Sequence, residues 1–248
     1  MDRSAAEPGR PDFPFYAGTP VLLGGWQWLL VLASLALAFW LLTTPLLPHP
    51  QGVGLLLRPL LFCTVPLLAL AWVAGPAWKA LFRKVRTRDV MLMFGIAALN
   101  LLVTVLVALL VSSAIHSSAN PAFGTLAQAD DATRLTAFVA MVPQLLGEEL
   151  FTLLPFLACL WLLHTKWKAS RRTALVLAWV LSAVPFALVH LPTYGWNVLQ
   201  CLVIIGTARL VLTLAYLLSR NLWVSTGAHV LNDWALFGFG LFATTAAG

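Results

Sequence analysis

Charged residues are scarce in this chain. Asp, Glu, Lys and Arg make up 10% of its 248 residues, and hydrophobic residues make up 60%, whereas roughly a quarter of the residues in soluble domains are charged. This composition excludes a soluble globular domain. The net charge is +6, but the basic residues lie in small groups between apolar runs and form no solvated basic face. We therefore expect membrane lipids as partners and no nucleic acid.

Cysteine is also scarce, and its placement excludes two further classes of protein. Cys63, Cys159 and Cys201 lie in separate apolar runs, without the close pairs of a zinc knuckle or a disulfide framework. Residues 1–19 carry acidic side chains, and the apolar run after them is too long for the core of a cleavable signal peptide. We expect residues 1–19 to form a cytoplasmic N-terminal tail and the first span to be retained.

Long apolar runs dominate the rest of the sequence and predict an all-α, polytopic transmembrane bundle of about seven spans in a single membrane domain. The runs lie at residues 20–43, 53–75, 90–115, 134–163, 173–191, 195–218 and 222–244. We divide them into N-terminal transmembrane helices, 20–133, and a second group, 134–248. No internal repeat is visible.

The basic residues indicate how these spans are oriented. Twelve of the 15 Lys and Arg residues precede span one or follow spans two, four and six. The loops at 44–52, 116–133 and 192–194 contain no Lys or Arg, and Arg134 lies at the edge of a span. Because cytoplasmic loops carry the excess of Lys and Arg, we predict a cytoplasmic N-terminus. We expect an integral protein of a bacterial cell membrane.

Several ionisable side chains stand inside the predicted spans, where each charge costs at least about 2.5 to 3.5 kcal/mol on insertion scales, which makes them candidates for function. Two of them, Arg58 and Arg209, are cations. The others are two glutamates near the middle of span four and a group of His, Asn and Asp side chains in spans five and seven: Glu148, Glu149, His190, His229, Asn232 and Asp233.

These residue types suit the activation of a water molecule. Adjacent helix positions differ by about 100°, so Glu148 and Glu149 point in different directions, and we expect one of them to carry the chemistry. A desolvated carboxyl group can take a proton from water and return it to a leaving amine. His229 and Asp233, four residues apart, share a helical face. The same set also suits zinc, with Glu148, His190 and His229 as ligands, so the sequence leaves a metal-free site and a zinc site both open.

Three known kinds of intramembrane protease do not fit the sequence. A site-2-type zinc protease needs His-Glu-x-x-His, and neither glutamate has such neighbours. A presenilin-type protease needs two intramembrane aspartates, but only Asp233 lies clearly within a span. A rhomboid-type protease needs a Gly-x-Ser-Gly loop, which the sequence lacks.

The second half of the chain resembles the CPBP or Abi intramembrane proteases, which include the type II CAAX prenyl endopeptidases. The resemblance covers about residues 134–236 and rests on three motifs in order. They are the pair Glu148 and Glu149, Phe186 with His190 four residues later, and His229 with Asp233 four residues later. It implies that residues 134–248 are the catalytic helices, that Glu148 activates water and Glu149 supports it, and that His190, His229 and Asp233 complete the site.

The family motif has Arg where this chain has Leu153. Either Arg209 or Arg58 replaces this cation from another helix, or the two glutamates share a proton. Asn232 lies beside Asp233, and the spacing favours Asp233 as the residue that faces the site. We name Phe186, Asn232 and Arg209 as supporting residues.

The leading hypothesis is an intramembrane endopeptidase, glutamate-type or metallo-type, that cleaves a membrane-bound or hydrophobic peptide. The alternative is a non-catalytic membrane scaffold or immunity-type protein that retains the protease fold. The reason for this alternative is Leu153, which stands where the family motif has Arg. A transporter is less consistent with the sequence, because its polar residues would be spread over repeated halves.

Overall fold

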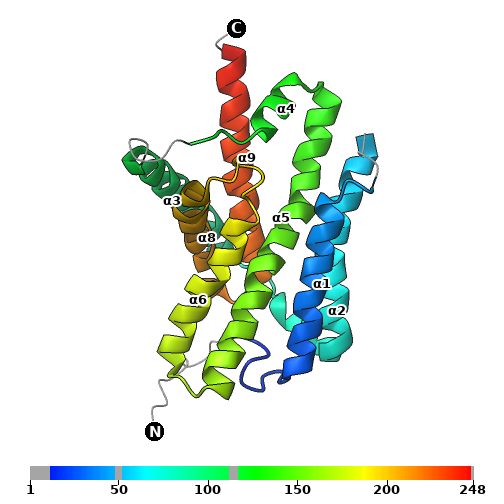
Figure 1. Ribbon diagram of the computed structural model, residues 1–248, viewed down its shortest axis with the longest axis vertical. Coiled ribbons are helices and arrows are strands. Elements are labelled where there is room, and N and C mark those ends of the chain that lie inside the picture. Colours follow the sequence, from blue (N-terminus) through cyan, green and yellow to red (C-terminus); the bar gives the residue numbers. More distant parts are fainter. Residues whose placement is uncertain (1–11, 48–51, 112–116, 247–248) are drawn as a thin grey trace.

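The computed structural model describes residues 12–47, 52–111 and 117–246, and within these residues the chain is a helical bundle without strands (Figure 1). The main helices are α1 (Gly25–Thr43), α2 (Leu57–Ala74), α3 (Thr87–Val111), α4 (Ala122–Gln128), α5 (Asp131–Leu160), α6 (Arg171–Leu188), α8 (Gly206–Ser219) and α9 (Leu222–Ala246). Shorter helical turns are η1 (Gly52–Leu56), η2 (Gly75–Leu81), η3 (Trp161–Lys166), α7 (Val198–Gln200) and η4 (Cys201–Ile205). The prediction of an all-α polytopic bundle is confirmed.

Six helical segments of the described residues are long and apolar enough to cross a membrane. They correspond to the first six predicted spans. The seventh forms the 25-residue helix α9 but is not among the six, because His229, Asn232 and Asp233 make it more polar than the others. We attribute its place in the bundle to the burial of these side chains against α3, α5 and α8, on which α9 packs.

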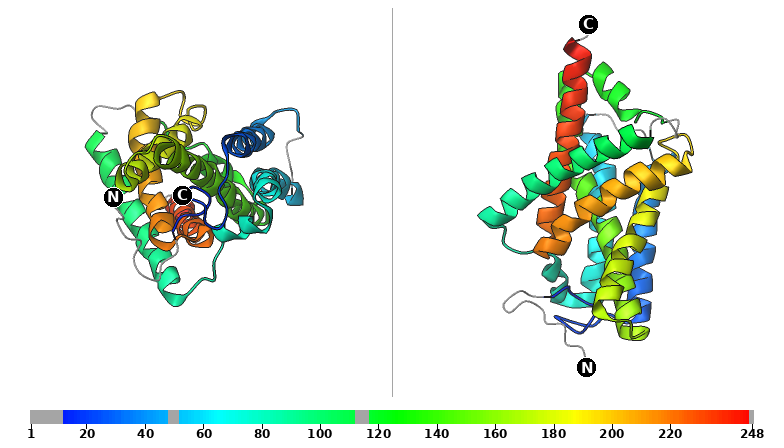
Figure 2. Two further views of the ribbon diagram at one scale, coloured as in Figure 1. Left: turned by 90° about the horizontal axis from the view of Figure 1, so that it is seen from below. Right: turned by 90° about the vertical axis from the view of Figure 1, so that its left-hand side faces the viewer.

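Helix α5 is the central element of the bundle and the most buried of the six apolar segments. It packs against α2, α6 and α9, while α1 packs mainly on α2. Helices α3 and α8 lie against each other and run obliquely to the upright helices (Figure 2, right). The second half of α5, from Leu145 onward, is therefore enclosed by other helices, and the polar groups on it lie inside protein.

Both ends of α5 are fixed by local interactions. The Asp130 side chain accepts a hydrogen bond of 2.7 Å from the Thr133 backbone N–H, which satisfies one of the free amides at the helix start. Arg134, in the first turn, donates to the carbonyl oxygens of Leu126 and Ala127. These bonds hold the end of α4 against the start of α5.

Residues 12–24 pack into the end of the bundle at which α1 begins. Phe13, Phe15, Tyr16 and Leu23 are buried there. Asp12 pairs with Arg171 of α6 and accepts a hydrogen bond from the Tyr16 hydroxyl. Burial raises the pKa of the Asp12 carboxyl, but the hydrogen bonds from Arg171 and Tyr16 outweigh it, so this pKa lies below its usual value. Burial and the bond to Asp12 raise the pKa of Tyr16 to about 12.

The orientation of the bundle stays a prediction, and cysteine labelling tests it. Lys84 and Ser170 are exposed and lie in the two most basic loops, which the positive-inside rule assigns to the cytoplasm. Cysteine at position 84 or 170, in a chain whose three native cysteines are replaced by Ala, should resist a membrane-impermeant maleimide in intact cells and react in inverted vesicles. Labelling of either position in intact cells contradicts this orientation.

Candidate active site

The two adjacent glutamates lie just beyond the middle of α5, where α2 approaches closely. A Cβ atom at Gly147 would collide with the ring of Phe62 on α2. Glycine therefore allows this approach next to Glu148, and it places both glutamates in a tightly packed part of the bundle.

Glu149 points into the protein and is fully buried. Its Oε1 atom lies 2.7 Å from Nη1 of Arg209 on α8, which is also fully buried. The guanidinium of Arg209 lies 5.0 Å from the centre of the Phe186 ring, a cation–π distance. Of the alternatives that Leu153 left open, the structure shows Arg209 supplying the cation from another helix. Arg58 instead donates to the carbonyl oxygens of Leu42 and Leu47.

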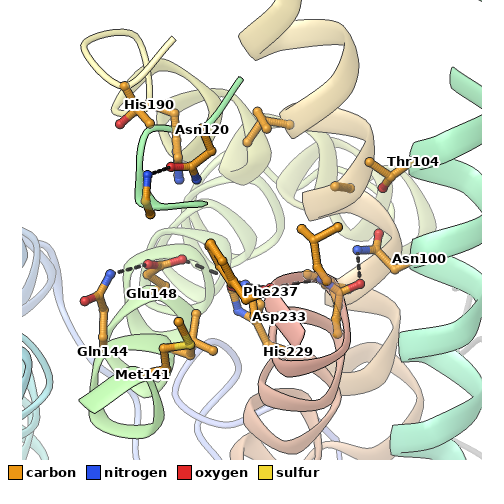
Figure 3. A pocket seen from close by; sticks show the side chains of 18 of the residues that line it. Asn100, Thr104, Asn120, Met141, Gln144, Glu148, His190, His229, Asp233 and Phe237 are labelled. Carbon is orange, nitrogen blue, oxygen red and sulfur yellow. Dashed lines mark hydrogen bonds and ion pairs between the residues drawn. The ribbon is translucent and has the colours of Figure 1, made fainter. Parts of the chain in front are cut away.

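His229 of α9 connects the two glutamates. Its Nδ1 atom lies 2.9 Å from Glu149 Oε1, and a carboxylate paired with Arg209 only accepts, so Nδ1 carries a proton. This bond fixes the imidazole so that Nε2 lies 3.8 Å from Glu148 Oε2 and 3.7 Å from Asp233 Oδ1. Figure 3 shows Glu148, His229 and Asp233 around one part of the pocket.

Glu148 differs from Glu149 in its surroundings. Its side chain retains 17% of its exposure and lines the pocket. Gln144, one turn earlier on α5, donates a hydrogen bond of 3.3 Å to Glu148 Oε1. The prediction that the two glutamates point in different directions is confirmed: one carboxylate is locked in an ion pair, and the other faces open space.

Asn232 and Asp233 both line the pocket, and they belong to one hydrogen-bonded chain. Asn100 of α3 donates to Asn232 Oδ1 at 2.9 Å, and Asn232 donates to Asp233 Oδ1 at 2.9 Å. Asn232 is the more buried of the two and orients Asp233. Within this pair, Asp233 is the residue whose carboxylate approaches His229 Nε2, in agreement with the spacing argument.

His190 lies in the turn after α6, where its Nδ1 bonds to the Phe186 carbonyl oxygen at 2.7 Å. Its ring packs 4.8 Å from the Phe186 ring. It lines the same pocket as Glu148 and His229 but makes no direct contact with either that the structure records. The geometry thus brings Glu148, Glu149, His229 and Asp233 into one cluster and leaves His190 apart from it, in the wall of the same pocket (Figure 3).

The pocket has a volume of about 570 Å³ and contains two polar residues that the sequence did not single out. Asn120 precedes α4, and Tyr194 lies in the turn after α6; a side-chain hydrogen bond joins them. Burial raises the pKa of the Tyr194 hydroxyl, and nearby Asp233 raises it further, so the phenol remains a donor. Neither residue belongs to a recognisable spacing motif. The only signal in the sequence is that both lie in short polar loops between predicted spans.

The side-chain arrangement gives no support to a zinc site. In the described residues, no group of three or more His, Cys, Asp and Glu side chains is arranged to hold a metal ion. Nδ1 of His229 bonds to Glu149 and Nδ1 of His190 to a backbone carbonyl, so only Nε2 of each ring is left for a ligand. The side chains of Glu148, His190 and His229 do not come together as the predicted ligand set.

The fold and the site together define a polytopic membrane protein with a carboxylate–histidine cluster inside its helical bundle. Residues 130–235 match the model of the family described as type II CAAX prenyl endopeptidase Rce1-like. This match at residues 130–235 confirms the resemblance that the motifs predicted. Searches of curated proteins and of solved structures found no significant match. The family match supports an intramembrane endopeptidase.

Proposed function

We propose that the protein hydrolyses a peptide bond in a hydrophobic or membrane-bound peptide by a glutamate-activated water. One observation carries this proposal: Glu148 is a partly exposed carboxylate in the pocket, whereas its neighbour Glu149 is fixed by Arg209 and His229. A structural ion pair accounts for Glu149 but not for Glu148.

The space between Glu148 and His229 suits a water molecule. The 3.8 Å between Glu148 Oε2 and His229 Nε2 exceeds a direct hydrogen bond, and contacts of this length often contain a bridging water. Glu148 takes one proton from this water while the water oxygen attacks the substrate carbonyl carbon. The proton on Glu148 then passes to the leaving nitrogen as the carbon–nitrogen bond breaks, which regenerates the carboxylate.

His229 stabilises the negative oxygen that forms on the carbonyl. The carboxylates of Glu149 and Asp233 flank its ring. Nδ1 donates to Glu149, and Nε2, when it also carries a proton, donates to the forming oxyanion. Glu149 then acts by positioning, since it fixes the ring through Nδ1. A hydrogen-bond donor that is already in position before the oxyanion forms raises turnover by about 10²- to 10³-fold. His190 lines the same pocket without contacting the cluster, and we assign it to holding the substrate.

The test of function is cleavage of a hydrophobic peptide by the purified protein in detergent or lipid nanodiscs, with mass spectrometry of the products. Site-specific cleavage that Glu148→Gln removes supports the proposal. If the purified protein folds normally and yields no product from a broad library of apolar peptides, the non-catalytic scaffold takes its place.

Chelation separates the glutamate mechanism from the zinc mechanism. We expect the purified protein to keep its activity in excess EDTA, because the site holds no fitting set of metal ligands. A zinc enzyme would contain about one equivalent of metal, and added zinc would restore the activity lost to the chelator. Loss and recovery of this kind, together with one equivalent of zinc by elemental analysis, would contradict the glutamate mechanism.

A further inference from the structure

The pocket occupies only one half of the bundle. Its wall is formed by the start of α2, the second half of α3, α4, the first eighteen residues of α5, the last turn of α6 and the turn after it, the first half of α8, and α9 from His229 to Phe237. Most of these parts lie at the end of the bundle where α2 and α5 begin and α3 and α6 end. His229 lies at its deep end, two turns into α9.

The other half of the bundle is filled. Phe13, Phe15 and Tyr16 of the N-terminal segment form one apolar cluster with the second half of α5, the start of α6 and the end of α8. The guanidinium of Arg220 lies 3.6 Å from the centre of the Phe13 ring, and the Thr165 hydroxyl donates to the Tyr16 carbonyl oxygen. This cluster lies between Glu148 and the basic end of the bundle.

A second, more apolar pocket lies beside the first one, at the same end of the bundle. It is lined by Phe39, Leu42, Phe62 and Phe151 of α1, α2 and α5, and by the turn 188–193 with Trp196. The two pockets share Gln144, Glu148, Phe186, His190 and Thr193 in their walls. Glu148 therefore lies where the larger set of polar side chains in the first pocket meets the more apolar second pocket.

The distribution of charge relates these pockets to the two sides of the membrane. Ten of the basic residues in the described part of the chain lie in or beside the loops at the filled end: Lys79, Arg83, Lys84, Arg86, Arg88, Lys166, Lys168, Arg171, Arg172 and Arg220. At the pocket end, Arg134 is committed to carbonyl oxygens of α4 and to Asp131. By the positive-inside rule, the filled end faces the cytoplasm.

We infer that the site is served from the non-cytoplasmic side of the membrane. Its substrate is a peptide at that face, with the scissile bond in the first pocket beside Glu148 and an apolar flank in the second pocket. The juxtaposition of the pockets at Glu148 and the sealed opposite end carry this inference. It rests on the proposed function and adds the side from which the substrate comes.

Labelling of single cysteines tests access without depending on activity. In the chain with Cys63, Cys159 and Cys201 replaced by Ala, Thr193→Cys reports on the wall shared by both pockets, and Thr125→Cys reports on the exposed rim at α4. Lys84→Cys is the matched control at the filled end. In intact cells, an impermeant maleimide should label positions 125 and 193 and should not label position 84. In inverted vesicles, it should label position 84 and should not label positions 125 and 193.

Three results would overturn the inference. The first is that position 193 is labelled from the cytoplasmic side only. The second is that positions 193 and 84 are labelled from the same side. The third is that positions 125 and 193 are protected from the reagent on both sides, although both react in the denatured protein. Each shows that the pocket is not open to the non-cytoplasmic face.

A pair of reporters then tests the substrate. The same apolar cleavable segment is tethered by one transmembrane anchor to the non-cytoplasmic face in one reporter and to the cytoplasmic face in the other. We expect cleavage of the first alone, and its loss with Glu148→Gln. Cleavage of the cytoplasmic reporter alone overturns the inference and leaves the protease intact. If neither reporter nor any peptide is cleaved while the labelling pattern holds, the proposed function fails and the open face remains established.

Discussion

Replacing Glu148 by Gln is expected to lower turnover by about 10²- to 10⁴-fold, the range that general-base catalysis supplies. Gln keeps the shape of the side chain and its contact with Gln144 but does not take a proton from water. Because Glu148 lines an open pocket and is not part of the Glu149–Arg209 ion pair, the variant should insert and fold normally. Initial rates with a cleavable peptide, together with the thermal unfolding midpoint, measure both effects.

Asp131→Asn is the matched control for this change. It removes a carboxylate from the same helix, where the Asp131 side chain is 99% exposed, and should leave turnover unchanged. Glu149→Gln should cost less turnover than Glu148→Gln, since Glu149 acts through His229. Equal turnover in wild type and Glu148→Gln would exclude Glu148 as the base.

The histidines extend the same test. His229→Ala should be about as severe as Glu148→Gln, and combining the two should add little, because residues that act as one unit are not additive. His190→Ala, which removes a group assigned to holding the substrate, should raise KM, and its effect should multiply with that of Glu148→Gln. A combined loss in Glu148→Gln with His229→Ala equal to the product of the single losses would show that His229 acts independently of the base.

The second large effect is on stability. Arg209→Met leaves the Glu149 carboxylate, which has no exposed surface, without its cation, and breaking a buried ion pair in this way costs about 3–5 kcal/mol. We expect a clear fall in the thermal unfolding midpoint in detergent. Arg172→Met, which removes an exposed cation from the start of α6, is the control and should leave the midpoint nearly unchanged.

A double-mutant cycle shows whether the loss comes from the uncompensated charge. Arg209→Met combined with Glu149→Gln removes both charges, so the double variant should be more stable than Arg209→Met alone. If the two single effects simply add, Arg209 and Glu149 do not stabilise each other, and Arg209 does not replace the cation missing at Leu153.

Hydrophobic composition and the length of the apolar runs were sufficient to predict the helical class and the first six spans, because an apolar helix of about 20 residues has few other stable environments. The seventh span was harder to judge. His229, Asn232 and Asp233 lower the hydropathy of α9, and only its packing against α3, α5 and α8 shows where these polar groups are accommodated. Spacing within a helix also predicted that Glu148 and Glu149 diverge, since the 100° step is a local property.

The sequence by itself thus determined the membrane class, the residue types of the candidate site and their order along the chain. The partners of those residues were decided by tertiary structure. Whether Arg58 or Arg209 would meet a glutamate depends on how α2 and α8 pack against α5, which no local pattern encodes. The same holds for the separation of His190 from the cluster and for the pocket residues Asn120 and Tyr194, because contacts between distant segments form only when the whole bundle packs.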